Sequence, residues 1–284
     1  MRISKGRARS GHRQNVALTL GVACALAVTG CAGEPEPLDS EQKVDLAVEG
    51  NTQRVWCAGP AIAGGSTSAP AVVLVSGIGD DATSAQWSKV KRRLVGGVRV
   101  CRYDRPGTGE SPDPVRPGRG ADALDLELAA VVDHASPDSS VLLAAHSFGA
   151  YPVLIYTARH PHRVAGVVLV DALDPGVGVA QGTGAASVQA VTMGREQLDL
   201  ADVERAAQSV RRLPGDPPLT VLTRGDATTP AWLAGQERLA QLSARSRRQS
   251  VRGSGHQMPY DEPDVIAAAV DALLTRRPMT QAAD

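Results

Sequence analysis

Residues 141–149 of this chain read VLLAAHSFG, and this stretch decides the fold class. An apolar run of strand length ends at Ala145, and a helical stretch follows Ser147 as far as His160. A serine on a sharp turn from a strand into a helix projects its hydroxyl at the carboxyl edge of a sheet. The flanking positions must be small, and Ala145 and Gly149 meet that requirement. We therefore predict that Ser147 is a nucleophile rather than a helix N-cap serine.

On both sides of Ser147, short β-rich runs alternate with helical stretches. This alternation is typical of a mostly parallel sheet that is covered by helices, so the chain is predicted to be of the α/β class. Eight strands are expected, and the first two form a hairpin. The expected strands are 44–49, 52–57, 71–75, 98–103, 141–145, 164–170, 219–223 and 248–252, and the expected helices are 84–95, 121–135, 148–160, 231–243 and 261–276.

The alternation breaks at residues 174–213, where glycine-rich turns surround one amphipathic stretch from Arg195 to Leu213. The sheet pattern resumes at residue 219. We interpret residues 43–284 as one domain that carries a small helical insert, rather than as two domains in series. The insert is expected to form a lid over the site.

A serine hydroxyl needs a base to accept its proton, and His256 is the candidate. It lies in the segment Gly253-Ser254-Gly255-His256, between the last predicted strand and the last helix. The glycines allow this loop to carry an imidazole back over the sheet edge. His160 is expected at the opposite edge, and the side chain of His146 is expected to leave the Ser147 turn in a different direction.

The acid that would orient the imidazole has two candidates. Asp171 ends the apolar strand at residues 164–170, and Asp226 follows the strand at residues 219–223. Both strand ends lie at the edge where Ser147 is expected. Each aspartate has the alternative role of a turn or N-cap residue.

Two backbone N–H groups are needed to stabilise the negative charge that develops during acyl transfer. Phe148, directly after the nucleophile, is expected to supply one of them. The glycine-rich loop Ser76-Gly77-Ile78-Gly79 follows the strand 71–75 at the same edge, and Ile78 is the expected second donor.

Together these residues resemble the α/β-hydrolase superfamily over about residues 44–276. The segment DRPGTGES at residues 104–111 matches the family's D-x-x-G-x-G-x-S loop, and Gly255-His256 followed by Pro263 matches its terminal pattern. Ser76 stands where many members have histidine. The resemblance implies an eight-stranded, mostly parallel sheet flanked by helices, with Ser147 before His256 in the chain.

The resemblance bears on the acid in two ways. The commonest family arrangement corresponds to Asp226, which also fits a D-x-x-x-P segment with Pro230. However, Asp226 directly follows Gly225, so one or two residues usually found there are absent. Other members carry the acid one strand earlier, which corresponds to Asp171.

A second pattern in this region concerns the same choice. Thr223-Arg224-Gly225, followed by Trp232 and Gln236, resembles actinobacterial hydrolases that often lack an acid in the later loop. We favour Asp171 and keep Asp226 as the alternative.

The predicted activity is that of a serine hydrolase acting on a small-molecule carboxylic ester or related acyl compound. We expect no cofactor and no metal, since no set of His, Cys and Asp residues has ligand-like spacing. A peptidase, a lactonase or a cofactor-free haloperoxidase would use the same triad. The alternative from another class is a non-catalytic binding lipoprotein. A dehalogenase is disfavoured because it would have aspartate in place of Ser147.

Residues 1–30 are predicted to be a lipoprotein signal peptide. Five basic residues precede an apolar run from Val16 to Val28 that is too short to span a bilayer. The segment Val28-Thr29-Gly30-Cys31 resembles a bacterial lipobox, so we expect lipidation of Cys31 and a flexible tether at residues 31–42. The domain is expected to be exported and anchored to the outer face of the cell membrane, with secretion as the alternative.

The remaining residues give the predicted mature chain 25 basic and 30 acidic side chains, a net charge of −5, which does not favour a nucleic-acid partner.

Export would place Cys57 and Cys101 in an oxidising compartment. Their strands are neighbours in the expected fold, so a disulfide is predicted, with two buried free thiols as the alternative.

Overall fold

The computed structural model describes residues 40–60, 69–226 and 228–275. All of them belong to one compact unit that starts at Pro37. The predicted signal peptide, Cys31 and most of the tether lie outside the described residues. No helix in these ranges has the length and apolar character needed to cross a membrane.

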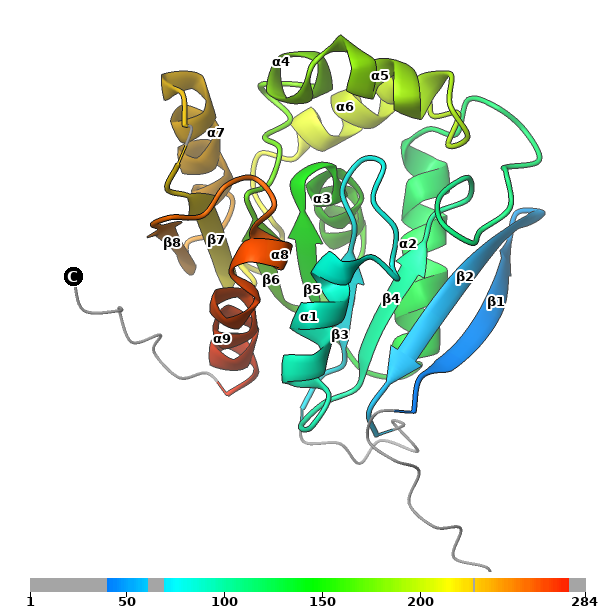
Figure 1. Cartoon of the computed structure of the whole chain (residues 1–284), viewed down its shortest axis with the longest axis horizontal. Coiled ribbons are helices and arrows are strands. Elements are labelled where there is room, and N and C mark those ends of the chain that lie inside the picture. The colour runs from blue at the N-terminus through cyan, green and yellow to red at the C-terminus, as the bar shows by residue number, and fades with distance from the viewer. Residues whose placement is uncertain (1–39, 61–68, 227, 276–284) are drawn as a thin grey trace, which may run out of the picture. The chain divides into compact units, whose positions relative to one another are not determined.

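An eight-stranded sheet forms the centre of the domain (Figure 1), in the order β1-β2-β4-β3-β5-β6-β7-β8. β2 is antiparallel to β1 and β4, and every pair from β4 to β8 is parallel. This confirms the predicted fold class. The strands are β1 (Gln42–Val48), β2 (Asn51–Ala58), β3 (Val72–Val75), β4 (Val100–Asp104), β5 (Val141–His146), β6 (Val164–Val170), β7 (Leu219–Arg224) and β8 (Ser246–Val251).

Helices cover both faces of the sheet. α1, α8 and α9 pack on one face, and α2, α3 and α7 pack on the other. The helices are α1 (Ala85–Leu94), α2 (Ala121–Ala135), α3 (Ala150–Arg159), α4 (Val179–Thr183), α5 (Ala185–Thr192), α6 (Leu200–Ser209), α7 (Pro230–Ala240), α8 (Met258–Asp261) and α9 (Pro263–Leu274), with short 3₁₀ turns η1 (Ser147–Gly149) and η2 (Pro161–Arg163).

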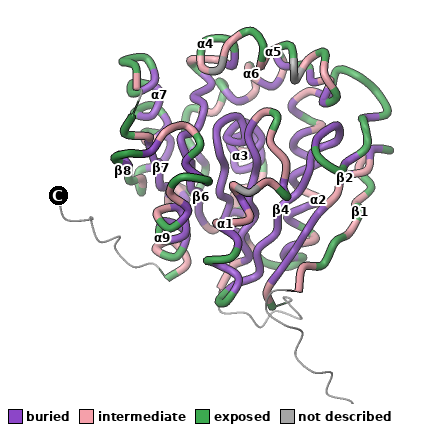
Figure 2. Tube along the Cα trace, in the orientation of Figure 1, coloured by how far each residue is buried: buried purple, intermediate pink, exposed green. Residues whose placement is uncertain are grey.

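The central strands are apolar throughout because both of their faces are covered. In β3, Val73 and Val75 join the core on one face, whereas Val72 and Leu74 join the core on the other. Figure 2 shows the buried centre of the domain and the more exposed trace of β1. Because β3, β5 and β6 pair in parallel, their carboxyl ends lie side by side at one edge of the sheet.

The insert between β6 and β7 differs in detail from the prediction. The amphipathic stretch 195–213 forms a shorter helix, α6, because the Asp199 side chain caps it by accepting from Asp202 N. Two short helices, α4 and α5, were not predicted, since helices of five and eight residues show little periodicity. Gly178 and Gly184, both with positive φ, precede these two helices.

A disulfide joins Cys57 and Cys101. The two cysteines are directly paired across the antiparallel strands β2 and β4. Both are buried in the core on the α2 and α3 side of the sheet. The bond links the antiparallel part of the sheet to its parallel part.

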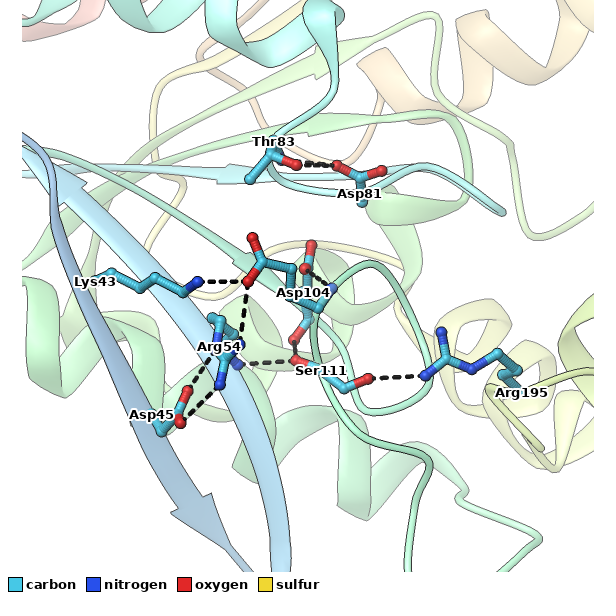
Figure 3. Close-up of polar contacts among 9 residues, drawn as sticks. Lys43, Asp45, Arg54, Asp81, Thr83, Asp104, Ser111 and Arg195 are labelled. Atoms are coloured by element: carbon cyan, nitrogen blue, oxygen red, sulfur yellow. Dashed lines mark hydrogen bonds and ion pairs between the residues drawn. The ribbon is translucent and has the colours of Figure 1, made fainter.

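The loop after β4 folds back on itself through Asp104 (Figure 3). The Asp104 carboxylate accepts from the backbone N–H groups of Ala82 and Glu110, both at 2.7 Å. Ser111 Oγ donates to the Asp104 carbonyl and accepts from Arg54 N, both at 2.8 Å. These contacts hold the loop against β2 and the segment that precedes α1.

Candidate active site

Ser147 occupies the turn between β5 and α3 with a φ of +52°. This left-handed conformation is strained for a residue with a side chain. The turn also lies close to the end of β3. A Cβ at Gly149 would stand 2.6 Å from Val75 O and 2.8 Å from Ser76 O, so glycine is required there. The predicted strand, turn and helix around Ser147 are therefore present.

His256 lies in the loop between β8 and α8 and reaches Ser147. The Ser147 hydroxyl lies 3.0 Å from His256 Nε2, within hydrogen-bond distance. On the other side of the ring, Nδ1 lies 2.6 Å from Asp171 Oδ2. The three side chains thus form one hydrogen-bonded row from a serine through a histidine to a carboxylate.

Asp171 follows β6, and its side chain is completely buried. Its other donors are the backbone N–H and the guanidinium of Arg224, each at 3.1 Å, and Trp232 Nε1 at 3.0 Å. Burial of a carboxylate is unfavourable unless donors replace its water, and these groups do so. Like Ser147, Asp171 has a positive φ, of 39°.

Asp226, the alternative acid, is placed by a different set of contacts. After β7 the chain continues along β8, because Gly225 N donates to Val251 O at 2.8 Å and Asp226 N donates to Ser254 O at 3.2 Å. This course leaves Asp226 exposed at the edge of the sheet. Of the two candidates, the structure brings only Asp171 to the histidine.

The predicted oxyanion-hole residues flank Ser147. Gly77 lies against the turn, since a Cβ added to it would stand 3.2 Å from Ser147 Cβ. Ile78 and the fully buried Phe148 pack into the same apolar cluster. The loop 76–79 and the start of α3 therefore lie on two sides of the nucleophile.

Arg105 connects this loop to the insert. Its buried guanidinium donates to Ser76 O at 2.8 Å and to Gly77 O at 2.9 Å. The same guanidinium forms a bidentate ion pair with Glu196, with N–O distances of 2.8 and 3.1 Å. Arg119 extends the network by donating to Glu196 O and pairing with the buried Glu127. This network was not predicted from the sequence.

His146 lies beside the site, and its contact with His256 was not predicted from the sequence. Its Nε2 donates to His256 O at 2.7 Å, and the two ring centroids are 4.8 Å apart. Burial, together with repulsion from His256, lowers the pKa of His146 to about 4, so the ring is neutral at neutral pH. Alternation along β5 contained the signal, because His146 follows Leu142 and Ala144, which face the α8 and α9 side.

The insert covers the end of the sheet where these residues meet. Figure 1 shows α4, α5 and α6 grouped beyond that end. Leu173, Val179 and Val203 pack in one apolar cluster with Phe148 and Trp232. Only 3% of Ser147 is exposed in this arrangement.

Comparison with known proteins agrees with this fold. A family model for the alpha/beta hydrolase fold matches residues 70–195. The chain is 25% identical over 211 residues to the uncharacterised protein YqjL of Bacillus subtilis, which covers 70% of this chain and 82% of that protein. It is 36% identical over 83 residues to the uncharacterised protein C23C11.06c of Schizosaccharomyces pombe, 29% of this chain but only 15% of that protein.

Solved structures share the fold at low sequence identity. Carboxylesterase CesB from Bacillus subtilis has a TM-score of 0.63 at 15% identity, over 84% of this chain and 93% of that chain. The enol-lactonase from Burkholderia xenovorans LB400 has a TM-score of 0.58 at 21% identity, over 82% of this chain and all of that chain. A thioesterase domain and a haloalkane dehalogenase also have this fold, which by itself does not identify a substrate.

Proposed function

We propose that this chain, which has the α/β-hydrolase fold, is a serine hydrolase that cleaves a carboxylic ester or a related acyl bond. The observation that carries the proposal is the row Ser147–His256–Asp171, with distances of 3.0 and 2.6 Å. Such a row is the arrangement that turns a weakly nucleophilic hydroxyl into a nucleophile.

In the proposed first step, His256 accepts the hydroxyl proton while Ser147 Oγ attacks the acyl carbon. The backbone N–H groups of Phe148 and Ile78 stabilise the oxyanion. His256 then protonates the departing alkoxide, and an acyl-enzyme remains. In the second step His256 removes a proton from water, the resulting hydroxide attacks the acyl carbon, and Ser147 takes its proton back as the carboxylic acid leaves. Asp171 stabilises the imidazolium in both steps.

A fluorophosphonate probe tests the proposal without knowledge of the substrate. The wild type should be labelled, and Ser147→Ala should not. Ser209→Ala, which alters an exposed serine on α6, is the matched control and should be labelled like the wild type. Folded wild type that resists labelling would contradict the proposal and favour a binding role.

A panel of substrates tests which acyl compound the protein prefers. We propose that the insert acts as a lid that selects the substrate, since it covers the end of the sheet around Ser147. Carboxylic esters of increasing chain length, a thioester and a lactone would be compared. We expect the highest kcat/KM with a small or medium carboxylic ester.

We also propose that the chain is exported and lipid-anchored through Cys31. The lipobox-like segment supports this proposal, as does the disulfide between Cys57 and Cys101, a bond that persists in oxidising compartments. Cys31→Ser should release the protein from the membrane fraction. An unchanged membrane fraction in that variant would contradict lipid anchoring.

A further inference from the structure

We propose that Arg224 and Trp232 are positioning residues of the site, which hold the Asp171 carboxylate and moderate its support of the His256 imidazolium. This inference rests on the proposed serine hydrolase function. It also gives a role to the residues of the segment 223–236 that the proposed mechanism does not use.

The contacts of Asp171 carry the inference. Oδ1 accepts from Arg224 N at 3.1 Å and from Trp232 Nε1 at 3.0 Å. Oδ2 is shared between Arg224 Nη1 at 3.1 Å and His256 Nδ1 at 2.6 Å. Each oxygen therefore has two donors, and the carboxylate cannot rotate without losing at least one of them.

Trp232 also contacts Arg224 and His256. The guanidinium carbon of Arg224 lies 4.2 Å from the Trp232 ring centroid, which is a cation–π distance. The same indole meets the His256 ring at 88°, with the centroids 5.7 Å apart. Trp232 thus contacts the acid, its cationic partner and the base.

The first turn of α7 places Trp232. Thr229 Oγ1 accepts from Trp232 N at 3.1 Å as the N-cap, and Pro230 begins the helix. One turn later, Gln236 Nε2 donates to Ala172 O at 2.7 Å. Arg224, Trp232 and Gln236 therefore all fasten the two residues at the end of β6.

The charge arrangement gives the guanidinium a measurable effect. When His256 takes up the Ser147 proton, Asp171 Oδ2 lies between two cations, so its charge is divided between them. An imidazolium near a second cation is easier to deprotonate. The titratable or charged groups around His256 are neutral His146 from β5, Asp171 from β6, Arg224 from β7 and Asp261 from α8, the last facing Gly255.

Removal of the guanidinium charge should raise the midpoint of the acidic limb of the activity profile by about one pH unit. Arg224→Lys retains the charge, so its midpoint should stay much nearer to that of the wild type. Trp232→Phe keeps a ring but removes the Nε1 donor, and its maximal rate should fall about tenfold. A role in packing alone would not move the midpoint.

The experiment uses the full chain and measures the second-order rate of fluorophosphonate labelling of Ser147 as a function of pH. Arg224→Gln is compared with Arg224→Lys and Trp232→Phe. Arg248→Gln is the matched control, because Arg248 lies on the adjacent strand in an exposed ion pair with Glu237. Its midpoint should equal that of the wild type.

The inference is supported if the midpoint of the acidic limb is raised in Arg224→Gln and stays near the wild-type midpoint in Arg224→Lys. Equal midpoints for Arg224→Gln and wild type overturn it, as do equal shifts for the Gln and Lys variants. If thermal melting shows that Arg224→Gln is unfolded, Trp232→Phe decides, and a wild-type labelling rate in that variant overturns the inference. Absent labelling of the wild type overturns the proposed function itself, which separates the two failures.

Discussion

Arg105 and Glu196 form an ion pair that is almost fully buried, with 2% and 5% of their side chains exposed. Arg105 belongs to the loop after β4, and Glu196 belongs to the insert. Because Arg105 also binds the carbonyls of Ser76 and Gly77, the loop beside the nucleophile and the insert above it share one anchor.

Replacement of Arg105 alone should be strongly destabilising. Arg105→Met leaves the Glu196 carboxylate buried without its partner, which should lower the free energy of unfolding by about 3–5 kcal/mol. Urea denaturation measures this loss. The matched control is Arg205→Met, which removes an exposed ion pair on α6 and should change stability by less than about 1 kcal/mol.

The double variant Arg105→Met with Glu196→Leu should recover much of the stability, since no unpaired charge remains. Its turnover should stay low because nothing then holds the carbonyls of the loop 76–79. A double variant with wild-type kcat would show that this anchor does not position the loop.

Single substitutions at the two candidate acids should have very different effects. Asp171→Asn removes the charge beside His256 and should reduce kcat by about 10⁴-fold. Asp226→Asn changes an exposed residue and should leave kcat near the wild-type value. Ester turnover in both variants measures this contrast, and a larger loss at Asp226 would show that the wrong acid was assigned.

The neutral, buried state of His146 should appear in the pH dependence of stability. Its pKa is about 4 in the folded protein and 6.5 in its ordinary state, so between these values the unfolded chain binds more protons. The contribution of neutral His146 to the free energy of unfolding is therefore fully present above pH 6.5 and is lost as the pH falls toward 4. It amounts to about 3 kcal/mol.

His146→Gln keeps a donor for His256 O but does not titrate. Its free energy of unfolding should fall less steeply between pH 6.5 and 4 than that of the wild type. His162→Gln, at an exposed position in η2, is the control and should follow the wild-type curve. Equal slopes for wild type and His146→Gln would contradict the prediction.

The disulfide should contribute substantially to stability. It closes a loop with a sequence separation of 44 residues, for which the chain-entropy model gives about 4 kcal/mol. The double variant Cys57→Ala with Cys101→Ala should show this loss in urea denaturation. Mass spectrometry of unreduced wild-type peptides should find the two cysteines linked, and detection of free thiols would contradict the bond.

Local features of the sequence were sufficient to predict the turn at Ser147. A strand buried on both faces reads as a continuous apolar run, and the small residues around Ser147 mark a tight turn, so both signals lie within a few residues. The same holds for the glycine-flanked loop of His256. Short helices such as α4 lacked such a signal because one turn of helix has no period.

The choice of acid was different, because Asp171 and Asp226 follow adjacent parallel strands. The sequence pattern favoured Asp171 but left Asp226 open. In the structure, the two aspartates are separated by backbone hydrogen bonds from Gly225 to Val251, the last residue of β8, and from Asp226 to Ser254 beyond it. The contact of His146 with His256, and that of Arg105 with Glu196 across 91 residues, likewise depend on which loops meet at the sheet edge.

The sequence by itself therefore determined the order of the elements, the turn that bears Ser147 and the loop that bears His256, because each depends on neighbours along the chain. Only the tertiary structure decided which carboxylate meets His256 and which groups surround that carboxylate. The physical reason is that Asp171, Arg224 and Trp232 come from three elements, and their hydrogen bonds exist only after β6, β7 and α7 have packed together.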